Sequence, residues 1–520
     1  MRSLGLVHLI PPLFSIHLAL AVSIPFRGYL SDSTHLSKRN NLTGISVTNG
    51  GNIIYGASIN LGGNNFSVVL DTGSADLWVA GSVSSTQDTG KGVSVAYAVG
   101  NVQGNINLAT LTFDDYSVNN QAYILVQDSS SFSPTLQSNG FQGLIGLGFD
   151  AESIVRNKLG KGAGDTPLSR IFQLNKTTQN FVSIQLNRAK DPSDPITGQI
   201  TISEVISGYE NVTSQPKLYL KDAFMDSSNQ HWAVVTDNNG VIGPGGDDIS
   251  IESIVPHVSG GKMVAVLDSG FTFSQVPRKM SDAIYGRVQG ANYSTTEGIW
   301  KVPCTQNLSL SFVFGGVTVP IHPLDIVSND LDASDPSGLC DGAFQPISTA
   351  FSMLGHYDMI LGMNALRNMY TLFDYGNFVA DTSNDQGDPY VQLLPLTDPT
   401  SALADFAKVR QNGTSSSSSN ILLPASQESH SPVSATEKKQ HLEGAVARNW
   451  PYIFVGCLAF VLSVLGCCVY ACCCRKRRKG GARPFTRNPY QAIHEPPPPP
   501  MHMRPINSGG QYADPYRPRP

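Results

Sequence analysis

Two stretches of the chain share one order of apolar and polar positions. In each, a short aliphatic run, typical of a buried strand, leads directly into an aspartate, a hydroxyl residue and a glycine. The first reads VVLDTGSADLWVA (residues 68–80) and the second AVLDSGFTFSQVP (residues 265–277). A carboxylate beside so much apolar surface costs free energy unless hydrogen bonds or a partner compensate it, so both aspartates need an explanation.

One such stretch alone would favour an ordinary Asx-type turn that closes a hairpin. Here Asp71 and Asp268 lie 197 residues apart in two copies of the pattern, and the duplication favours a pair of equivalent sites over two unrelated turns. A third Asp-Thr-Gly tripeptide, residues 88–90, follows a polar Ser-Ser-Thr-Gln stretch instead of an apolar run. Its pattern predicts an ordinary loop.

The remaining pattern predicts short strands separated by turns. Residues 44–130 alternate apolar runs with clusters of Gly, Asn and Ser, which is typical of β-meanders. Apolar-apolar-Gly triplets follow both aspartates, at residues 144–146 and 360–362, so we expect two lobes built on one plan. The other predicted elements are helices at 153–158, 167–174 and 280–289, strands at 181–186 and 198–202, and a strand pair within 308–320.

Composition agrees with a large, mainly β protein. Only 14% of the 520 residues are charged, and 49 Gly and 33 Pro favour many turns over long helices. We therefore expect a large, mainly β body before the long apolar run at residues 450–474.

The net charge of −5 conceals an asymmetry. Residues 475–520 carry a net charge of +8, so residues 1–474 carry −13. An acidic body argues against nucleic acid as a partner, and the basic tail needs a separate cause.

The N-terminus has the features of a secretory signal. Arg2 precedes an apolar run that ends in the small-residue pattern Ala19-Leu20-Ala21, so we expect residues 1–21 to be a signal peptide. The dibasic pair Lys38-Arg39 is either a processing site that would release residues 22–39 as a short propeptide or a solvated basic pair.

A second apolar run, residues 450–474, is long enough to cross a bilayer as a helix. The cluster RKRRK at residues 475–479 follows it, and by the positive-inside rule that cluster is cytoplasmic. A glycolipid-anchor signal would end the chain, whereas here a polar tail follows. We therefore expect a type I single-pass membrane protein, at the plasma membrane or else in the vacuole or secretory pathway.

The segments on either side of the apolar run are low in complexity. Residues 401–449 are rich in Ser, Thr and Pro and predict a flexible stalk. Residues 475–520 are basic and Pro-rich, and we expect them to be disordered.

Cysteine positions divide into two groups. Six of the eight cysteines lie within the apolar run. Those near its cytoplasmic end are either palmitoylation sites or simply small packing residues, and the sequence favours neither role. Cys304 and Cys340 remain outside it, and in an oxidising compartment they should pair. No zinc signature occurs before the apolar run, and we expect neither a metal nor a cofactor.

Seven Asn-x-Ser/Thr sequons precede the apolar run and are candidates for glycosylation. They are Asn41, Asn65, Asn175, Asn211, Asn292, Asn307 and Asn412.

Two aspartates at equivalent strand ends suggest that the lobes bring them together. Two carboxylates a few ångströms apart share one proton because they cannot both ionise easily. The ionised member can take a proton from water while the protonated member donates to a carbonyl oxygen. Such a pair would hydrolyse an amide without a covalent enzyme intermediate.

The motifs together resemble those of pepsin-like aspartic endopeptidases, and the C-terminal anchor is similar to that of surface-bound fungal members. The resemblance covers roughly residues 45–395 and implies a bilobal domain there, with an N-terminal lobe at about 45–205 and a C-terminal lobe at about 206–395. It rests on DTGSADLWV, AVLDSG, the two apolar-apolar-Gly triplets, ILGMNALRNMYTLFD and the Cys304–Cys340 pair.

The resemblance implies a bilobal pepsin-like fold with an active-site cleft between the lobes, a role for each motif residue, and a monomer acting on proteins and peptides at acidic pH. Asp71 and Asp268 would be the catalytic pair. The residues expected to support or cover them are Thr72, Gly73, Ser74, Ser269, Gly270, the flap residues Tyr97, Gly100 and Gly104, and Trp78.

Three positions depart from the family pattern. Phe271 stands where a Thr or Ser is usual, so Asp268 lacks the hydroxyl donor that Ser74 offers to Asp71. Ala98 replaces a usual flap glycine, and residues 22–39 are short for a prosegment. The main alternative function is therefore a binding protein on the same fold with weak or no catalysis; a surface adhesion protein would explain the stalk but not the paired aspartates.

Overall fold

The computed structural model describes most of the region between the expected signal peptide and the basic tail. The described residues are 22–29, 54–97, 100–113, 115–128, 136, 140–176, 179–188, 197–222, 230–329, 338–347, 356–379, 387–413, 422–433 and 435–477. The predicted signal peptide, the Lys38-Arg39 pair, Asn41 and residues 478–520 of the tail lie outside them.

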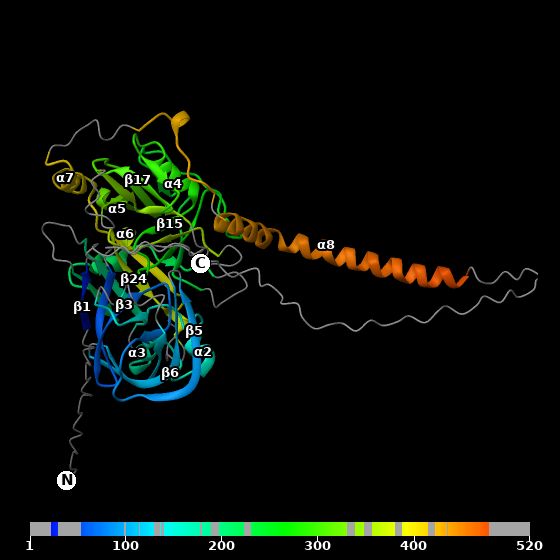
Figure 1. Cartoon of the computed structure of the whole chain (residues 1–520), viewed down its shortest axis with the longest axis horizontal. Helices are drawn as coiled ribbons and strands as arrows, with labels where there is room; N and C mark the ends of the chain where they lie inside the picture. Colours follow the sequence, from blue (N-terminus) through cyan, green and yellow to red (C-terminus); the bar gives the residue numbers. More distant parts are fainter. Residues whose placement is uncertain are drawn as a thin grey trace, which may run out of the picture. The chain divides into compact units, whose positions relative to one another are not determined.

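In its described residues, the N-terminal half is built mainly from strands, together with the short helices α2 and α3 (Figure 1). Its elements are β1 (Val22–Tyr29), β2 (Ile54–Leu61), β3 (Asn64–Asp71), β4 (Leu77–Val79), β5 (Gln87–Tyr97), β6 (Gly100–Phe113), β7 (Tyr116–Asp128), β8 (Gly143–Gly146), α2 (Ile154–Leu159), α3 (Pro167–Leu174), β9 (Phe181–Leu186) and β10 (Thr197–Ile202).

The C-terminal half has shorter strands and more helices. Its elements are η1 (Glu210–Ser214), β11 (Leu218–Tyr219), β12 (Ala233–Val235), β13 (Val241–Ile242), β14 (Val264–Leu267), β15 (Ser274–Val276), α4 (Arg278–Tyr285), β16 (Asn292–Ser294), β17 (Ile299–Pro303), β18 (Leu310–Phe314), β19 (Val317–Ile321), α5 (Pro323–Ile326), β20 (Val327–Ser328), β21 (Leu339–Gly342), β22 (Phe344–Pro346), β23 (Met359–Leu361), α6 (Met363–Leu366), β24 (Met369–Asp374), η3 (Gly376–Phe378) and β25 (Tyr390–Pro395).

The two halves repeat one arrangement around the aspartates. In the first half β3 pairs in parallel with β8, and β4 pairs antiparallel with β8. In the second half β14 pairs in parallel with β23, and β15 pairs antiparallel with β23. The predicted mainly β, bilobal fold with one plan in both lobes is confirmed.

The halves are joined by a shared sheet. Strands β24, β25 and β11 of the C-terminal half extend the N-terminal sheet, because β24 pairs antiparallel with β9. A buried aromatic group adds to this junction: Trp232 is fully buried, its Nε1 donates to the carbonyl of Leu147 at 3.1 Å, and its ring lies 4.4 Å from that of Phe149. The two halves therefore share both backbone pairing and core.

Strand β1 lies inside the segment expected to be a propeptide. It pairs antiparallel with β10 on one side and with β2 on the other. Backbone hydrogen bonds therefore tie residues 22–29 into the shared sheet. After a cut following Arg39, these backbone hydrogen bonds would still hold the strand in the sheet.

The expected flexible stalk is wrong for its first residues. Helix α7 (Pro399–Arg410) begins at the N-cap Asp398, whose side chain accepts from the Ser401 N–H, and it buries Ala402 and Phe406. Farther along, buried Ser431 donates its hydroxyl to Asp282 at 2.6 Å. The Ser-rich composition hid these contacts because they depend on a few positions.

The apolar run forms part of helix α8 (Ala435–Arg477). Within it, residues Arg448–Tyr470 are long and apolar enough to cross a membrane, with a mean hydropathy of 2.5. Phe454 begins a structural unit separate from the preceding body.

The predicted disulfide is present. Cys304 follows β17 and Cys340 lies in β21, and their sulfur atoms are bonded across 36 residues of sequence. Of the cysteines in the apolar run, the described Cys457, Cys467 and Cys468 are free and exposed.

A buried ion cluster connects the end of β9 to helices α5 and α6. The Asp325 carboxylate lies 2.5 Å from the Arg188 guanidinium and 2.8 Å from that of Arg367, and it accepts from the Asn368 amide at 3.0 Å. Burial alone would raise the pKa of Asp325, but the charges of Arg188 and Arg367 outweigh it and hold that pKa far below its ordinary value of 3.8. Because the pKa of this carboxyl is lowered on folding, the cluster stabilises the fold fully above pH 3.8 and loses its effect only as the pH falls through the lowered pKa.

We expect Asp325→Asn to destabilise the body by about 3–5 kcal/mol, because it leaves two buried guanidinium groups without their counter-charge. Denaturant unfolding at pH 5 measures this loss. Asp405→Asn, at a carboxylate that is 44% exposed, is the matched control and should change the free energy of unfolding by less than about 0.5 kcal/mol. Equal stability of the two variants would contradict the role given to the cluster.

Candidate active site

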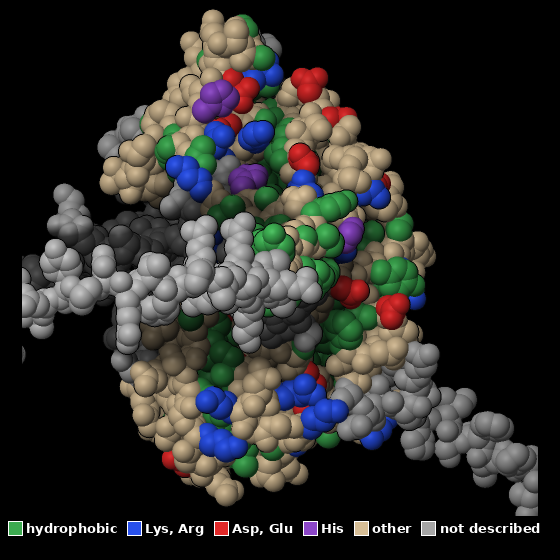
Figure 2. Space-filling model, turned by 90° about the vertical axis from the view of Figure 1, so that its right-hand side faces the viewer, with side chains coloured by type: hydrophobic (Ala, Val, Ile, Leu, Met, Phe, Trp, Pro, Cys, Tyr) green, Lys and Arg blue, Asp and Glu red, His purple; other side chains and the backbone are tan. Residues whose placement is uncertain are grey.

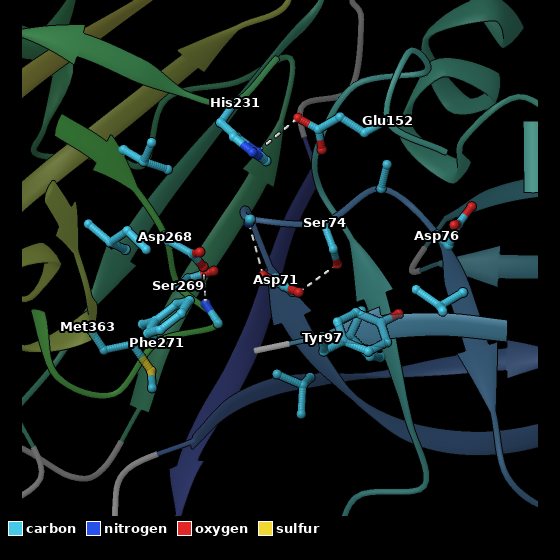
Figure 3. A pocket seen from close by; sticks show the side chains of 18 of the residues that line it. Asp71, Ser74, Asp76, Tyr97, Glu152, His231, Asp268, Ser269, Phe271 and Met363 are labelled. Atoms are coloured by element: carbon cyan, nitrogen blue, oxygen red, sulfur yellow. Dashed lines mark hydrogen bonds and ion pairs between the residues drawn. The ribbon is translucent and has the colours of Figure 1, made fainter. Parts of the chain in front are cut away.

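Both motif aspartates lie at the ends of buried strands, where the two repeated units meet. Asp71 is the last residue of β3, and Asp268 directly follows β14. Their exposed fractions are 6% and 7%. The apolar runs before them therefore hold two carboxylates at neighbouring strand ends in a largely buried setting (Figure 3).

The hydroxyl residues after the aspartates form a reciprocal set of hydrogen bonds. The Thr72 N–H donates to Ser269 Oγ at 3.0 Å, and the Ser269 N–H donates to Thr72 Oγ1 at 2.9 Å. Each hydroxyl then donates to a strand carbonyl of the other half, Thr72 to Leu267 and Ser269 to Leu70, both at 2.9 Å. Four buried hydrogen bonds thus tie the two loops together.

The glycines of the two motifs make room for the opposite carboxylates. A Cβ at Gly73 would lie 2.1 Å from Asp268 Oδ2, and a Cβ at Gly270 would lie 2.4 Å from Asp71 Oδ1. Any larger residue would collide with the opposite carboxylate. The close approach of Asp71 and Asp268 therefore requires glycine at both positions.

The hydrogen bonds to the two carboxylates differ. Asp71 accepts from the Ser74 hydroxyl at 2.5 Å and from the Gly73 N–H at 2.9 Å. Asp268 accepts from the Gly270 N–H at 2.8 Å, and the residue that corresponds to Ser74 is Phe271, which has no hydroxyl. Asp71 is thus the better stabilised anion.

The pKa shifts follow this asymmetry. Burial raises the pKa of Asp71, while the hydrogen bonds from Ser74 and Gly73 oppose the rise. Burial and, next, the charge of Asp71 raise the pKa of Asp268 well above its ordinary value. When the pair holds one proton, this asymmetry favours ionised Asp71 and protonated Asp268.

The β5–β6 hairpin places Tyr97 beside the carboxylates. Tyr97 pairs with Gly100 at the tip of the hairpin, and its side chain lines the same pocket as the two aspartates. Trp78 is fully buried in the cluster against which Tyr97 packs. A Cβ at Gly104 would lie 2.0 Å from the Leu125 carbonyl, so this glycine allows β6 and β7 to approach closely. Ala98 lies outside the described residues.

The pocket around the pair is mostly apolar. Four hydrophobic residues that stand in or next to the motifs, Val69, Leu144, Val266 and Phe271, all line it. Figure 2 shows hydrophobic side chains, with acidic ones among them, across the middle of one face of the molecule.

Two charged residues of the pocket were not predicted. Glu152 and His231 line it together with the aspartates, and their side chains form an ion pair with 3.1 Å between Glu152 Oε1 and His231 Nδ1. Neither lies in a motif with recognisable spacing. The sequence offers no signal for them, because they come from different halves and meet only in the fold.

Asp76, inside the first motif, binds the N-terminal end of helix α2. Its carboxylate accepts from the Ser153 hydroxyl at 2.6 Å and from the N–H groups of Ile154 and Val155 at 2.9 and 3.2 Å. These are N-terminal groups of helix α2, which lack partners within the helix. Asp76 therefore anchors α2 next to the pocket.

The predicted loop at the third Asp-Thr-Gly tripeptide is wrong. Residues 88–90 belong to strand β5, at a bulge where the register with β6 shifts. The Gly90 N–H donates to Asp88 Oδ1 at 2.8 Å, and Gly90 has a φ of +70°. The tripeptide makes a local Asx-type turn within the strand and does not line the pocket.

The described sequon asparagines are mostly on the surface. Asn307 is partly buried, with its Oδ1 shielded from solvent. The exposed ones are Asn65, Asn175, Asn211, Asn292 and Asn412. Within the described part of the chain, no group of three His, Cys, Asp or Glu side chains could hold a metal ion.

Comparison with protein families gives one match over most of the body. A family described as eukaryotic aspartyl protease matches residues 54–381. This range contains both aspartates, the β5–β6 hairpin and the disulfide.

Individual relatives are distant in sequence. Major aspartyl peptidase 1 of Cryptococcus neoformans var. grubii is 23% identical, over 62% of this chain and 66% of that protein, just under two thirds of its length. Cathepsin E-B of Xenopus laevis is 27% identical, over 60% of this chain and 74% of that protein. Penicillopepsin-2 of Penicillium janthinellum is 24% identical, over 64% and 78%.

Proposed function

The chain belongs to the eukaryotic aspartyl protease family, and we propose that it hydrolyses peptide bonds in proteins through Asp71 and Asp268. The observation that carries this proposal is the close approach of the two carboxylates, since each lies against the glycine of the opposite motif. Burial and mutual repulsion favour a pair with a single proton.

Each carboxylate has a distinct role in the proposed reaction. Ionised Asp71 takes a proton from a water molecule, whose oxygen attacks the peptide carbonyl carbon. Protonated Asp268 donates its proton to the carbonyl oxygen, which gives a neutral tetrahedral intermediate. Proton transfer from Asp71 to the amide nitrogen then accompanies cleavage of the C–N bond, and Asp268 regains its proton from the collapsing intermediate.

The pocket favours a particular class of substrate. Its apolar lining suits bulky hydrophobic side chains on either side of the cleaved bond. Tyr97, at the end of the β5–β6 hairpin, would pack over the bound peptide and exclude water from the reacting atoms.

We expect Asp71→Asn and Asp268→Asn each to lower kcat/KM for an apolar peptide by about 10²–10⁴-fold at acidic pH, since each removes one proton-transfer partner. The assay compares the full-length protein with and without a statine-type inhibitor. Asp88→Asn is the matched control, because Asp88 belongs to the third Asp-Thr-Gly tripeptide but lies outside the pocket.

Two outcomes would contradict this assignment. Unchanged hydrolysis in the Asp71 and Asp268 variants would place the activity elsewhere. Absence of inhibitor-sensitive hydrolysis in the unaltered protein would favour the alternative of a binding protein on this fold.

The missing hydroxyl at residue 271 leads to a pH prediction. In Phe271→Thr, a hydroxyl donor to Asp268 lowers the pKa of that carboxyl, so the pair loses its last proton at lower pH. We expect the alkaline limb of the kcat/KM profile to move down by about half a pH unit or more. Phe271→Val is the control, because valine has the shape of threonine but no hydroxyl, and it should not show this shift. Coincident pH profiles for the Phe271→Thr and Phe271→Val variants would refute the explanation.

We further propose that the span Arg448–Tyr470 anchors the protein as a type I membrane protein. Its length and apolarity support a crossing, and the RKRRK cluster at residues 475–479 supports a cytoplasmic C-terminus. The catalytic body would then face the outside or the lumen, most simply at the plasma membrane.

An epitope fused after Pro520 tests this orientation. In intact cells, an antibody should reach an epitope in the body but not the C-terminal one, and permeabilisation should expose both. Labelling of the C-terminal epitope in intact cells would overturn the proposed topology.

A further inference from the structure

A buried ion pair lies in the wall of the pocket, beside the two aspartates. Glu152 Oε1 and His231 Nδ1 are 3.1 Å apart, and the side chains are 7% and 18% exposed. Figure 3 shows the pair next to Asp268, Asp71 and Ser74, with the carboxylate coming from the N-terminal half and the imidazole from the C-terminal half. The reaction described above uses neither residue.

The fold holds both members of the pair in place. Glu152 lies just before helix α2, and its N–H donates to the Phe149 carbonyl at 3.0 Å. A Cβ at Gly148 would lie 2.6 Å from Glu152 Oε2, so the carboxylate occupies space that this glycine leaves open. It is therefore seated in the fold rather than free in solvent.

The imidazole is held next to the strand that carries Asp268. Trp232, which follows His231, is fully buried, and its carbonyl accepts from the Leu267 N–H at 3.0 Å. Leu267 in turn precedes Asp268. The hydrogen bond between Leu267 and Trp232 thus brings the backbone at His231 next to the backbone at Asp268.

His231 is the single basic side chain among the described residues that line the pocket. The other titratable groups facing this space are acidic or phenolic: Asp71, Asp76, Glu152, Asp268, Tyr97 and Tyr357. A cation on His231 therefore acts on several acidic groups without competition from any described Lys or Arg in the lining.

The charge of the pair depends on pH. Burial disfavours the charged imidazole, but the Glu152 carboxylate, and beyond it Asp268 and Asp71, outweigh burial and raise the pKa of His231. Burial raises the pKa of Glu152 to about 6 despite the opposing charge of His231. Below about pH 6 Glu152 is protonated, so its contribution to the raised pKa of His231 is lost. The charges of Asp268 and Asp71 still favour the imidazolium against burial, and it then faces the two aspartates without a counter-charge from Glu152.

We propose that cationic His231 stabilises the singly ionised aspartate pair at acidic pH and thereby extends its working range downward. Within this chain Ser74 stabilises Asp71 by a hydrogen bond, whereas Phe271 offers no hydroxyl to Asp268. His231 supplies a long-range charge interaction to both carboxylates and acts through them, without a role in proton transfer. The inference rests on the proposed peptidase function.

The test is the pH profile of kcat/KM for an apolar peptide, measured on the full-length protein in detergent. In His231→Gln, loss of the cation raises the pKa at which the pair first ionises, so the acid limb should move to higher pH by about half to one unit. His231→Lys keeps a positive charge and should return the limb toward its original position. His430→Gln, at a histidine that is 63% exposed and outside the pocket, is the control and should leave the limb unmoved.

A double variant separates charge from stability. His231→Gln leaves the Glu152 carboxyl buried without its partner, whereas Glu152→Gln with His231→Gln removes both charges. Since Glu152 is already neutral in the acid range, the double variant should show the same acid-limb shift as His231→Gln. The pH dependence of the Kd for a statine-type inhibitor should shift in the same direction, and this readout needs no turnover.

The outcomes distinguish the two proposals. If hydrolysis remains inhibitor-sensitive but the acid limbs of His231→Gln and of the double variant coincide with that of the unaltered protein, the role of His231 is refuted. The proposed peptidase function would stand in that case. Lower thermal stability with unchanged limbs would make the pair a structural link between the halves. Absence of inhibitor-sensitive hydrolysis in the unaltered protein would instead refute the proposed peptidase function.

Discussion

The reciprocal hydrogen bonds between Thr72 and Ser269 are the constraint on which the rest of the site depends. They join two loops that come from different halves of the chain, and they are buried, so breaking one leaves polar groups without water. With the loops held in this way, Gly73 and Gly270 admit the opposite carboxylates to close approach. The repulsion between Asp71 and Asp268 is thus opposed by hydrogen bonds beneath them.

The surroundings of the two carboxylates then divide their roles. Asp71 receives a short hydrogen bond from Ser74, while Asp268 faces Phe271, and burial together with the charge of Asp71 raises the pKa of Asp268 well above its ordinary value. Burial disfavours ionisation of the pair, and both hydrogen bonds and a nearby positive charge oppose that effect. Among the described pocket residues, His231 is the one side chain that can provide such a charge.

Contacts between residues far apart in the sequence also hold the two lobes together. Strand β24 pairs with β9, Trp232 packs on Phe149, and Asp325 binds Arg188 from the other half. The last of these keeps its charge in acid, because the pKa of Asp325 lies far below its ordinary value. An enzyme proposed to work at low pH therefore has a junction between its lobes that protonation does not easily weaken.

The sequence alone determined the features that depend on local pattern. Apolar runs ending in Asp-hydroxyl-Gly marked Asp71 and Asp268, their repetition predicted two β lobes, and a long uncharged segment marked the span within helix α8. The tertiary structure decided what depends on residues far apart in the chain meeting in space. The Glu152–His231 pair and the shared sheet are examples, and neither leaves a periodic signal. Helix α7 and the bulge at Asp88 were misread because a few specific contacts outweighed the local composition.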